Sequence, residues 1–226
     1  MNLPHVEEVA NFEQKCPLVV VIDRSGSMEG PAIKEVNNGL KMFKKGIVSD
    51  PTAKSRLELA IISYDNNINV ESDFTLLDND TEMPTLIAGG LTYTAEALQK
   101  AIDIVEERKL YYKKMGLTYY RPYIVLLTDG CSSNRDALKL MATKIQNGIE
   151  NRKFNFWAFG VENASMEELN MLGGKKSIIE KLKNVDKIGT FFEWLGNSMQ
   201  QVSHSNQGDH IDLRPEKDKD PFLHTT

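Results

Sequence analysis

The fold of this chain is decided by the stretch Val19-Val20-Val21-Ile22-Asp23-Arg24-Ser25-Gly26-Ser27-Met28. Its apolar half is continuous rather than alternating, which is typical of a strand covered on both faces in a parallel sheet. We expect this strand to end at Asp23 and to lead into a turn at Gly26, where glycine lets the chain fold back sharply. Ligands of open α/β sheets bind at the carboxyl ends of the strands. Asp23, Ser25 and Ser27 therefore mark a candidate site, with hard oxygen donors of the kind that Mg²⁺ or Mn²⁺ prefers.

A second stretch of the same kind supplies the other half of this candidate site. Tyr123-Ile124-Val125-Leu126-Leu127 predicts a further buried strand, and Thr128-Asp129-Gly130 follows it directly. Between the two strands, the loop Ala88-Gly89-Gly90-Leu91-Thr92 presents a threonine just ahead of a helical segment. Three loops at one sheet edge are thus expected to bring together what we call the five-oxygen cluster: Asp23, Ser25, Ser27, Thr92 and Asp129.

These residues also have interpretations that need no metal. Ser25 and Ser27 could cap the following helix, since serine is a favoured N-cap residue, and Asp129-Gly130 could be a simple turn. Thr94 competes with Thr92 for the site, although we expect Thr94 to cap the next helix. The two aspartates favour the metal, because carboxylates a few Å apart repel by roughly 3 to 4 kcal/mol at an effective dielectric constant near 20. A divalent cation removes that repulsion.

The motifs resemble those of the von Willebrand factor A (VWA) domain. The metal-ion-dependent adhesion site of that family combines Asp-x-Ser-x-Ser with a distant threonine and a later aspartate. Asp23, Ser25 and Ser27 match the first element. Thr92 matches the second through Gly-Gly-x-Thr, and Asp129 in Thr-Asp-Gly matches the third. The resemblance covers residues 15–203 and implies a Rossmann-like VWA fold.

Further segments resemble bacterial VWA proteins associated with tellurite resistance. They are Asp50-Pro51, Tyr120-Arg121-Pro122-Tyr123 and Phe191-Phe192-Glu193-Trp194-Leu195. The resemblance implies a stress-response or signalling complex with kinase-like or phosphatase partners.

The resemblance also implies a function, which is metal-dependent protein binding rather than catalysis. One position on the metal would be left for a Glu or Asp of another protein. The alternative is a magnesium-dependent phosphohydrolase with Asp23 as nucleophile or metal ligand. Against it, no second carboxylate follows Asp23 by two residues, and no lysine or histidine stands where acid/base catalysis would need it.

Composition excludes some classes of protein. The chain has 226 residues and a formal net charge of −5, so it lacks the basic footprint of a nucleic-acid-binding domain. No apolar run approaches the ~20 residues of a membrane span, and the first residues do not read as a signal peptide. With only Cys16 and Cys131 there is no disulfide framework, which favours a reducing compartment. We therefore expect a cytoplasmic protein.

The remaining pattern predicts an α/β fold, a doubly wound and mostly parallel sheet with one short antiparallel edge strand within 68–77. Apolar residues at helical spacing predict helices over about 31–47, 94–113, 138–149 and 195–202. Further strands are expected over 57–64 and 154–161. Three parts follow: an N-terminal extension (1–14), the VWA domain (15–203) and a polar C-terminal tail (204–226) that we expect to be mobile.

Overall fold

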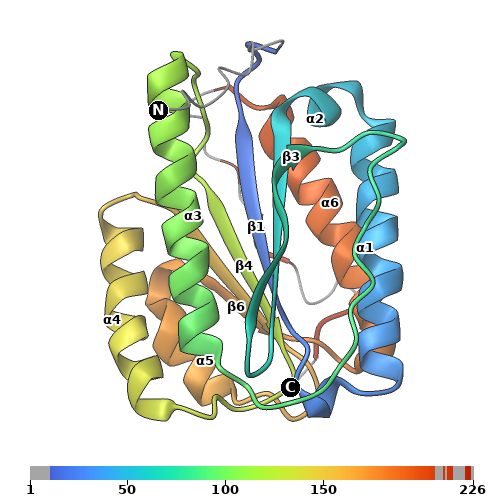
Figure 1. Cartoon of the computed structure of the whole chain (residues 1–226), viewed down its shortest axis with the longest axis vertical. Helices are drawn as coiled ribbons and strands as arrows, with labels where there is room; N and C mark the ends of the chain where they lie inside the picture. The colour runs from blue at the N-terminus through green and yellow to red at the C-terminus, as the bar shows by residue number, and fades with distance from the viewer. Residues whose placement is uncertain (1–10, 207–210, 212, 216–221, 225–226) are drawn as a thin grey trace, which may run out of the picture.

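The structure is a computed structural model that describes residues 11–206, 211, 213–215 and 222–224. A six-stranded sheet of order β3-β2-β1-β4-β5-β6 lies between two layers of helices (Figure 1). All neighbouring strands are parallel except β2 and β3, which are antiparallel. The strands are β1 (Cys16–Asp23), β2 (Leu57–Tyr64), β3 (Ile68–Leu76), β4 (Tyr123–Thr128), β5 (Asn155–Gly160) and β6 (Ile178–Lys181).

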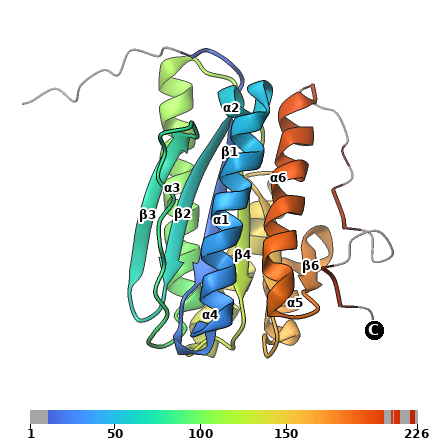
Figure 2. The same ribbon diagram turned by 90° about the vertical axis from the view of Figure 1, so that its right-hand side faces the viewer.

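The helices divide between the two faces of the sheet (Figure 2). One face is covered by α1 and α6, with α2 beside them, and the other by α3, α4 and α5. The helices are α1 (Pro31–Ser49), α2 (Pro51–Arg56), α3 (Thr94–Met115), α4 (Arg135–Glu150), α5 (Met166–Gly173) and α6 (Ile188–His204). No helix of the described residues is long and apolar enough to cross a membrane.

The continuous apolar run in β1 has a direct structural cause. Leu18, Val20 and Ile22 belong to the core under α1 and α6, whereas Val19 and Val21 belong to the core under α3 and α4. Because successive side chains of a strand point to opposite faces, a strand covered on both sides must be apolar at every position. The prediction of a doubly wound, mostly parallel sheet is therefore confirmed.

The antiparallel edge strand is confirmed as well, and at nine residues β3 is longer than the short strand expected. The pattern missed α2, α5 and β6. These elements have six, eight and four residues, which are too few for periodicity to stand out from the background.

Part of the C-terminal tail, residues 222–224, is docked on the domain. Lys183 N donates to Phe222 O (2.8 Å) and His224 N donates to Lys181 O (2.8 Å), so Leu223 forms an isolated antiparallel bridge with Leu182, directly after β6. Phe222 and Leu223 are both buried. The sequence analysis weighed the polar residues of the tail and gave no weight to these two adjacent apolar ones. Of the expected N-terminal extension, residues 1–10 lie outside the described residues.

Replacing Phe222 with alanine should release this segment and leave the domain folded. The Phe222 ring lies 5.6 Å from the Trp194 ring, centroid to centroid. The chain has only two tryptophans, so exposure of Trp194 to water should shift the fluorescence maximum to longer wavelength. The unfolding free energy should fall by less than the ~3–5 kcal/mol usual for a buried phenylalanine, because the segment can detach. Leu140→Ala at an exposed site is the control, and an unshifted Phe222→Ala spectrum would contradict the docking.

Candidate metal site

The first part of the site is built by the turn that follows β1. Ser25 N donates to Asp23 Oδ1 (2.8 Å), which folds the chain back on the carboxylate. The Oγ atoms of Ser25 and Ser27 lie 3.1 Å apart. Ser25 precedes the short 3₁₀ turn Gly26–Met28 but makes no side-chain capping bond there, and the N-cap of α1 is Gly30. The capping interpretation of the two serines is therefore wrong.

The end of β4 supplies the second carboxylate. Because Ile22 pairs with Leu127 in the β1–β4 register, the two strands end side by side. Ser27 Oγ donates to Asp129 Oδ1 (2.6 Å), and Thr128 Oγ1 donates to Asp23 Oδ2 (2.5 Å). Residues more than 100 positions apart in the chain thus share one hydrogen-bonded network.

Thr92 reaches the same point from the loop before α3. A Cβ placed on Gly130 would lie 3.6 Å from Ser27 Oγ, 3.7 Å from Thr92 Oγ1 and 4.0 Å from Asp23 Oδ2. These oxygens therefore surround a space that only the absence of a side chain at Gly130 leaves free. The backbone of Thr92 is fixed by Ser133, whose N donates to Thr92 O (2.8 Å) and whose Oγ accepts from Thr92 N (3.0 Å).

The structure accordingly brings together all five predicted residues. Thr94 does not compete with Thr92, because its Oγ1 lies 3.4 Å from the Tyr64 hydroxyl in the core. The expectation that Thr94 caps α3 is wrong, since Thr94 is the first helical residue and Tyr93 precedes it as the N-cap. Sequence reasoning missed Thr128 and Ser133. Thr128 could have been predicted, because it is a hydroxyl residue at the end of the same buried strand. No feature of the sequence pointed to Ser133.

The carboxylates lack a compensating positive charge. Asp23, Ser25, Thr92 and Asp129 are buried, and Ser27 alone is exposed to solvent. Burial, with a smaller contribution from the Asp129 carboxylate, raises the pKa of Asp23 to about 6, although hydrogen bonds from Ser25 and Thr128 act in the opposite direction. Burial also raises the pKa of Asp129. Within the described part of the chain, no Lys, Arg or His forms an ion pair with either carboxylate, so their negative charge is free for a cation.

The donor set of the site fits a hard divalent cation. Among the described residues, no group of three or more His, Cys, Asp or Glu is placed to hold a metal, so this is not a site of the soft-ligand or carboxylate-rich kind. Two carboxylates and three hydroxyls are all-oxygen donors, as magnesium and manganese require. The open space beside Gly130 lies among them.

The loop that carries Thr92 is fastened to α1. Asn37 Nδ2 donates to Leu86 O (2.9 Å) and Asn37 Oδ1 accepts from Leu86 N (2.8 Å), so one side-chain amide pairs with the loop backbone as a strand would. Lys44 Nζ donates to Asn79 O (2.8 Å) and to Thr81 O (2.5 Å). The 17 residues 77–93, which contain no helix or strand, are thereby anchored to α1 at residues 79, 81 and 86.

Asn37→Ala should weaken metal binding about tenfold without touching a ligand. Two lost hydrogen bonds cost on the order of 1–3 kcal/mol in loop order, and 1.4 kcal/mol corresponds to a factor of ten. The measurement is a Mn²⁺ titration followed by electron paramagnetic resonance. Asn38→Ala is the matched control, because Asn38 lies exposed on the same helix and its side chain donates to Glu35 rather than to the loop. Equal affinities of the two variants would contradict a positioning role of Asn37.

Comparison with known proteins places the chain in a family. The model of the von Willebrand factor type A domain matches residues 18–194. The mouse (Mus musculus) collagen alpha-5(VI) chain is 28% identical over 208 residues, which covers 87% of this chain but 7% of the collagen chain. The chain thus spans a small fraction of the curated relative that it matches.

Solved structures share the fold. The von Willebrand factor type A protein from Catenulispora acidiphila superposes with a TM-score of 0.62 at 18% identity, covering 83% of this chain and 43% of that one. Proximal thread matrix protein 1 from the mussel byssus, in a structure described as having a zinc-occupied MIDAS motif, gives a TM-score of 0.59 at 14% identity. The superposition covers 84% of this chain and 48% of the mussel protein.

Proposed function

The chain belongs to the von Willebrand factor type A family, and from this premise we propose that it is a metal-dependent protein-binding module. The five-oxygen cluster would hold Mg²⁺ or Mn²⁺ and capture a Glu or Asp of a partner protein. The observation that carries the proposal is the convergence of Asp23, Ser27 and Thr92 oxygens on the open space beside Gly130. The mussel protein with a zinc-occupied MIDAS motif supports it, because a divalent ion is bound there on the same fold.

The composition of the cluster suits capture of a carboxylate. A bound divalent cation would supply the positive charge that Asp23 and Asp129 lack and would attract an acidic side chain. The three hydroxyl ligands are neutral, so only Asp23 and Asp129 offset the charge of the cation. Ser27 is exposed while Asp23 and Ser25 lie buried beneath it, so the cluster opens to solvent on the side of Ser27, where a partner can approach.

A chelator experiment tests this proposal. The protein is melted in the presence of EDTA and then with increasing Mg²⁺ or Mn²⁺. A ligand at a hundredfold excess over its dissociation constant stabilises the folded state by ~2.7 kcal/mol, which corresponds to roughly 5–10 °C for a chain of this size. Affinity capture of protein partners with and without EDTA is the second arm. If neither Mg²⁺ nor Mn²⁺ changed the melting temperature, the metal site would be overturned. If EDTA left partner capture unchanged, metal-dependent recognition would be overturned.

The phosphohydrolase alternative has less support. Arg24, the cation adjacent to Asp23 in sequence, has its guanidinium 2.8 Å from Asp65 Oδ2 and thus directed to another carboxylate. No Lys or His among the described residues hydrogen-bonds to the cluster. We therefore propose binding rather than catalysis. Turnover of a phosphate ester with Mg²⁺ that disappears in Asp23→Asn would reverse this conclusion.

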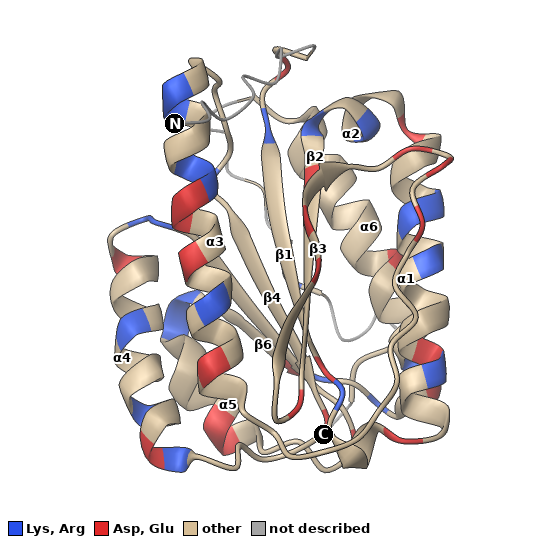
Figure 3. Cartoon of the chain, in the orientation of Figure 1, with Lys and Arg blue, Asp and Glu red and all other residues tan. Residues whose placement is uncertain are grey.

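The cellular setting is also part of our proposal. We propose a bacterial stress-response or signalling complex in the cytoplasm, of the tellurite-resistance type, with kinase-like or phosphatase proteins as partners. Its support is the set of quoted segments at residues 50–51, 120–123 and 191–195, together with the small number of cysteines. Lys and Arg are interspersed with Asp and Glu on helices such as α3 and α4 (Figure 3), and our proposal includes no nucleic-acid partner.

A further inference from the structure

A second cavity lies at the opposite end of the sheet from the five-oxygen cluster. It has a volume of about 720 Å³ and is lined by residues that begin β4 and β5 and by residues that follow α4 and α6. At ~3.3 Å per residue, the six residues of β4 separate the two sites by roughly 20 Å. The cavity is therefore independent of the metal site. Lining residues that matter here are Tyr120, Arg121, Tyr123, Glu150, Arg152 and Lys176.

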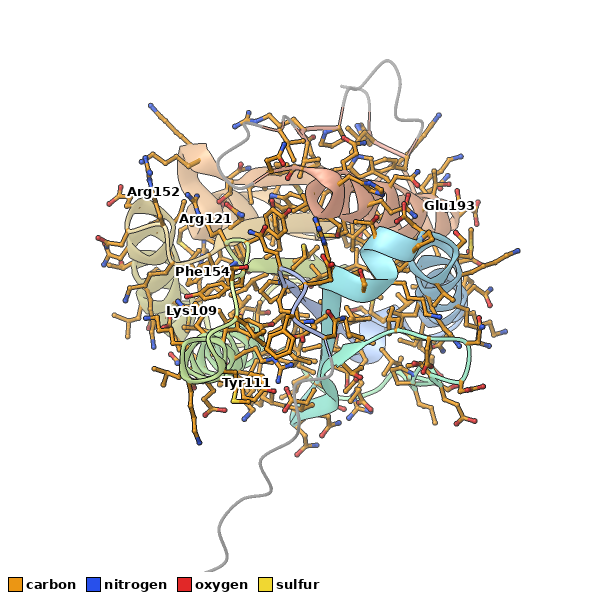
Figure 4. The ribbon with its side chains drawn as sticks, turned by 90° about the horizontal axis from the view of Figure 1, so that it is seen from above. Lys109, Tyr111, Arg121, Arg152, Phe154 and Glu193 are labelled. Carbon is orange, nitrogen blue, oxygen red and sulfur yellow. The ribbon has the colours of Figure 1, made fainter. Side chains whose placement is uncertain are left out.

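The lining carries an excess of positive charge. Arg121, Arg152 and Lys176 contribute three cations against the single carboxylate of Glu150, which leaves a net charge of about +2. None of these four residues forms an ion pair with any part of the chain that the structure describes. Figure 4 looks down on this end and shows Arg121 and Arg152 on the same side of the molecule. A phosphomonoester carries −1.5 to −2 charges at pH 7, which matches the lining.

Arg152 occupies a position where glycine would be less strained. Its φ is +54°, in the left-handed region, which disfavours residues with a Cβ. The turn is fixed by Arg152 N donating to Ile149 O (3.0 Å) and Lys153 N donating to Gly148 O (2.8 Å). This is a conformation in which helices commonly end, and it places Arg152 in the lining of the cavity.

The rest of the lining suits an aromatic or apolar group. The Tyr120 hydroxyl is used, because it donates to Ser205 O (2.5 Å). Tyr123 packs its ring against Trp157 at 5.0 Å between centroids, and burial raises the pKa of its phenol, so the hydroxyl stays protonated and can donate. The Arg121 guanidinium is oriented by donation to Asn155 Oδ1 (3.3 Å). Donors and ring faces thus line the same cavity.

We propose that this cavity binds an aromatic phosphomonoester, with the phosphate on Arg121, Arg152 and Lys176 and the ring against the tyrosines. The ligand chemistry has two sources, a free small molecule or a phosphorylated tyrosine of a polypeptide. Arginine forms two parallel hydrogen bonds with phosphate oxygens, so the two guanidinium groups set the geometry. Binding of the phosphomonoester in this cavity would not require the metal of the five-oxygen cluster.

Calorimetric titration with phenyl phosphate, in the presence of EDTA, tests the proposal. Arg152→Gly removes the guanidinium and relieves the positive φ, so the variant should fold with an equal or higher melting temperature. Phenyl phosphate should bind the wild type saturably and Arg152→Gly at least tenfold more weakly, since a charge-assisted hydrogen bond contributes ~1.5–3 kcal/mol. Arg121→Gln should show a similar loss. Lys34→Gln is the control, because it also removes one positive charge but lies exposed in the first turn of α1, which does not line the cavity. This variant should bind phenyl phosphate as tightly as the wild type does.

The outcomes separate the possible sources of the ligand. Tighter binding of a phosphotyrosine heptapeptide than of phenyl phosphate supports a phosphorylated polypeptide, and equal binding supports a small molecule. No saturable binding of phenyl phosphate, or equal affinity of wild type and Arg152→Gly, would overturn the proposal. Inorganic phosphate that binds as tightly as phenyl phosphate would overturn the aromatic part. Because EDTA is present throughout, failure here says nothing against the metal site, and failure of the metal titration says nothing against this cavity.

Discussion

Asp129→Ala should lose divalent-metal binding while the domain stays folded. Asp129 is one of only two carboxylates in the cluster and accepts a hydrogen bond from Ser27 Oγ at 2.6 Å. Removing an outer-shell partner of a metal typically lowers affinity 10–100-fold, so loss of a charged ligand should lower it at least about a hundredfold. The measurement is Mn²⁺ titration followed by electron paramagnetic resonance. Affinity capture of partner proteins by the variant and by the wild type, with Mn²⁺ present, is the second measurement.

The stability of this variant without metal separates a ligand from a structural residue. With EDTA present, Asp129→Ala should melt at or above the wild-type temperature, because a buried carboxylate that repels Asp23 has been removed. Asp136→Ala is the matched control, since Asp136 lies in the first turn of α4 with its side chain 93% exposed and pairs only with Lys139. Unaltered Mn²⁺ affinity in Asp129→Ala would refute the ligand assignment.

The second large effect is expected in the contact between α1 and α6. A Cβ on Gly39 would lie 2.2 Å from Phe192 Cδ2 and 2.9 Å from Cγ, inside the ring that packs there. Phe192 is buried and stands against Phe191, so the ring cannot move aside freely. Overpacking of this kind costs about 1–3 kcal/mol, which exceeds the ~1 kcal/mol that alanine gains over glycine in a helix. Gly39→Ala should therefore lower the unfolding free energy by up to about 2 kcal/mol in chemical denaturation.

Gly46→Ala on the same helix should have the opposite sign. A Cβ on Gly46 would meet only Gln200 Nε2, at 3.9 Å, so the helical preference of alanine acts without a clash. The unfolding free energy should rise by about 0.5–1 kcal/mol. If both substitutions shifted the unfolding free energy in the same direction, the claim that Gly39 is needed for close packing of α1 against α6 would be wrong.

The local sequence pattern was sufficient to predict the central strands of the sheet and the five-oxygen cluster. The runs in β1 and β4 are apolar at every position because helices cover both faces, and that rule can be read without coordinates. The parallel arrangement then places the residues after Ile22 and Leu127 together. Asp23 and Asp129 were predictable for this reason.

Other features depend on contacts that no local pattern records. Ser133 holds Thr92 only because the loop after β4 returns beside the loop before α3. The docking of Phe222 depends on a pocket formed by Phe191 and Trp194 in another part of the chain. The conformation of Arg152 is set by the turn between α4 and β5. Tertiary structure creates each of these features, so sequence analysis missed them.

The pairing of residues 222–224 with β6 has a consequence for association between copies of the protein. A sheet with an unpaired rim can recruit strands from other molecules, and natural proteins block that rim in several ways. Here the chain's own segment covers one rim only at residues 181–183, at the end of β6, while the opposite rim, β3, carries the exposed charges of Glu71 and Asp73. Removal of the docked segment would therefore uncover a template for self-association, and the damage would be seen as aggregation before any loss of folding.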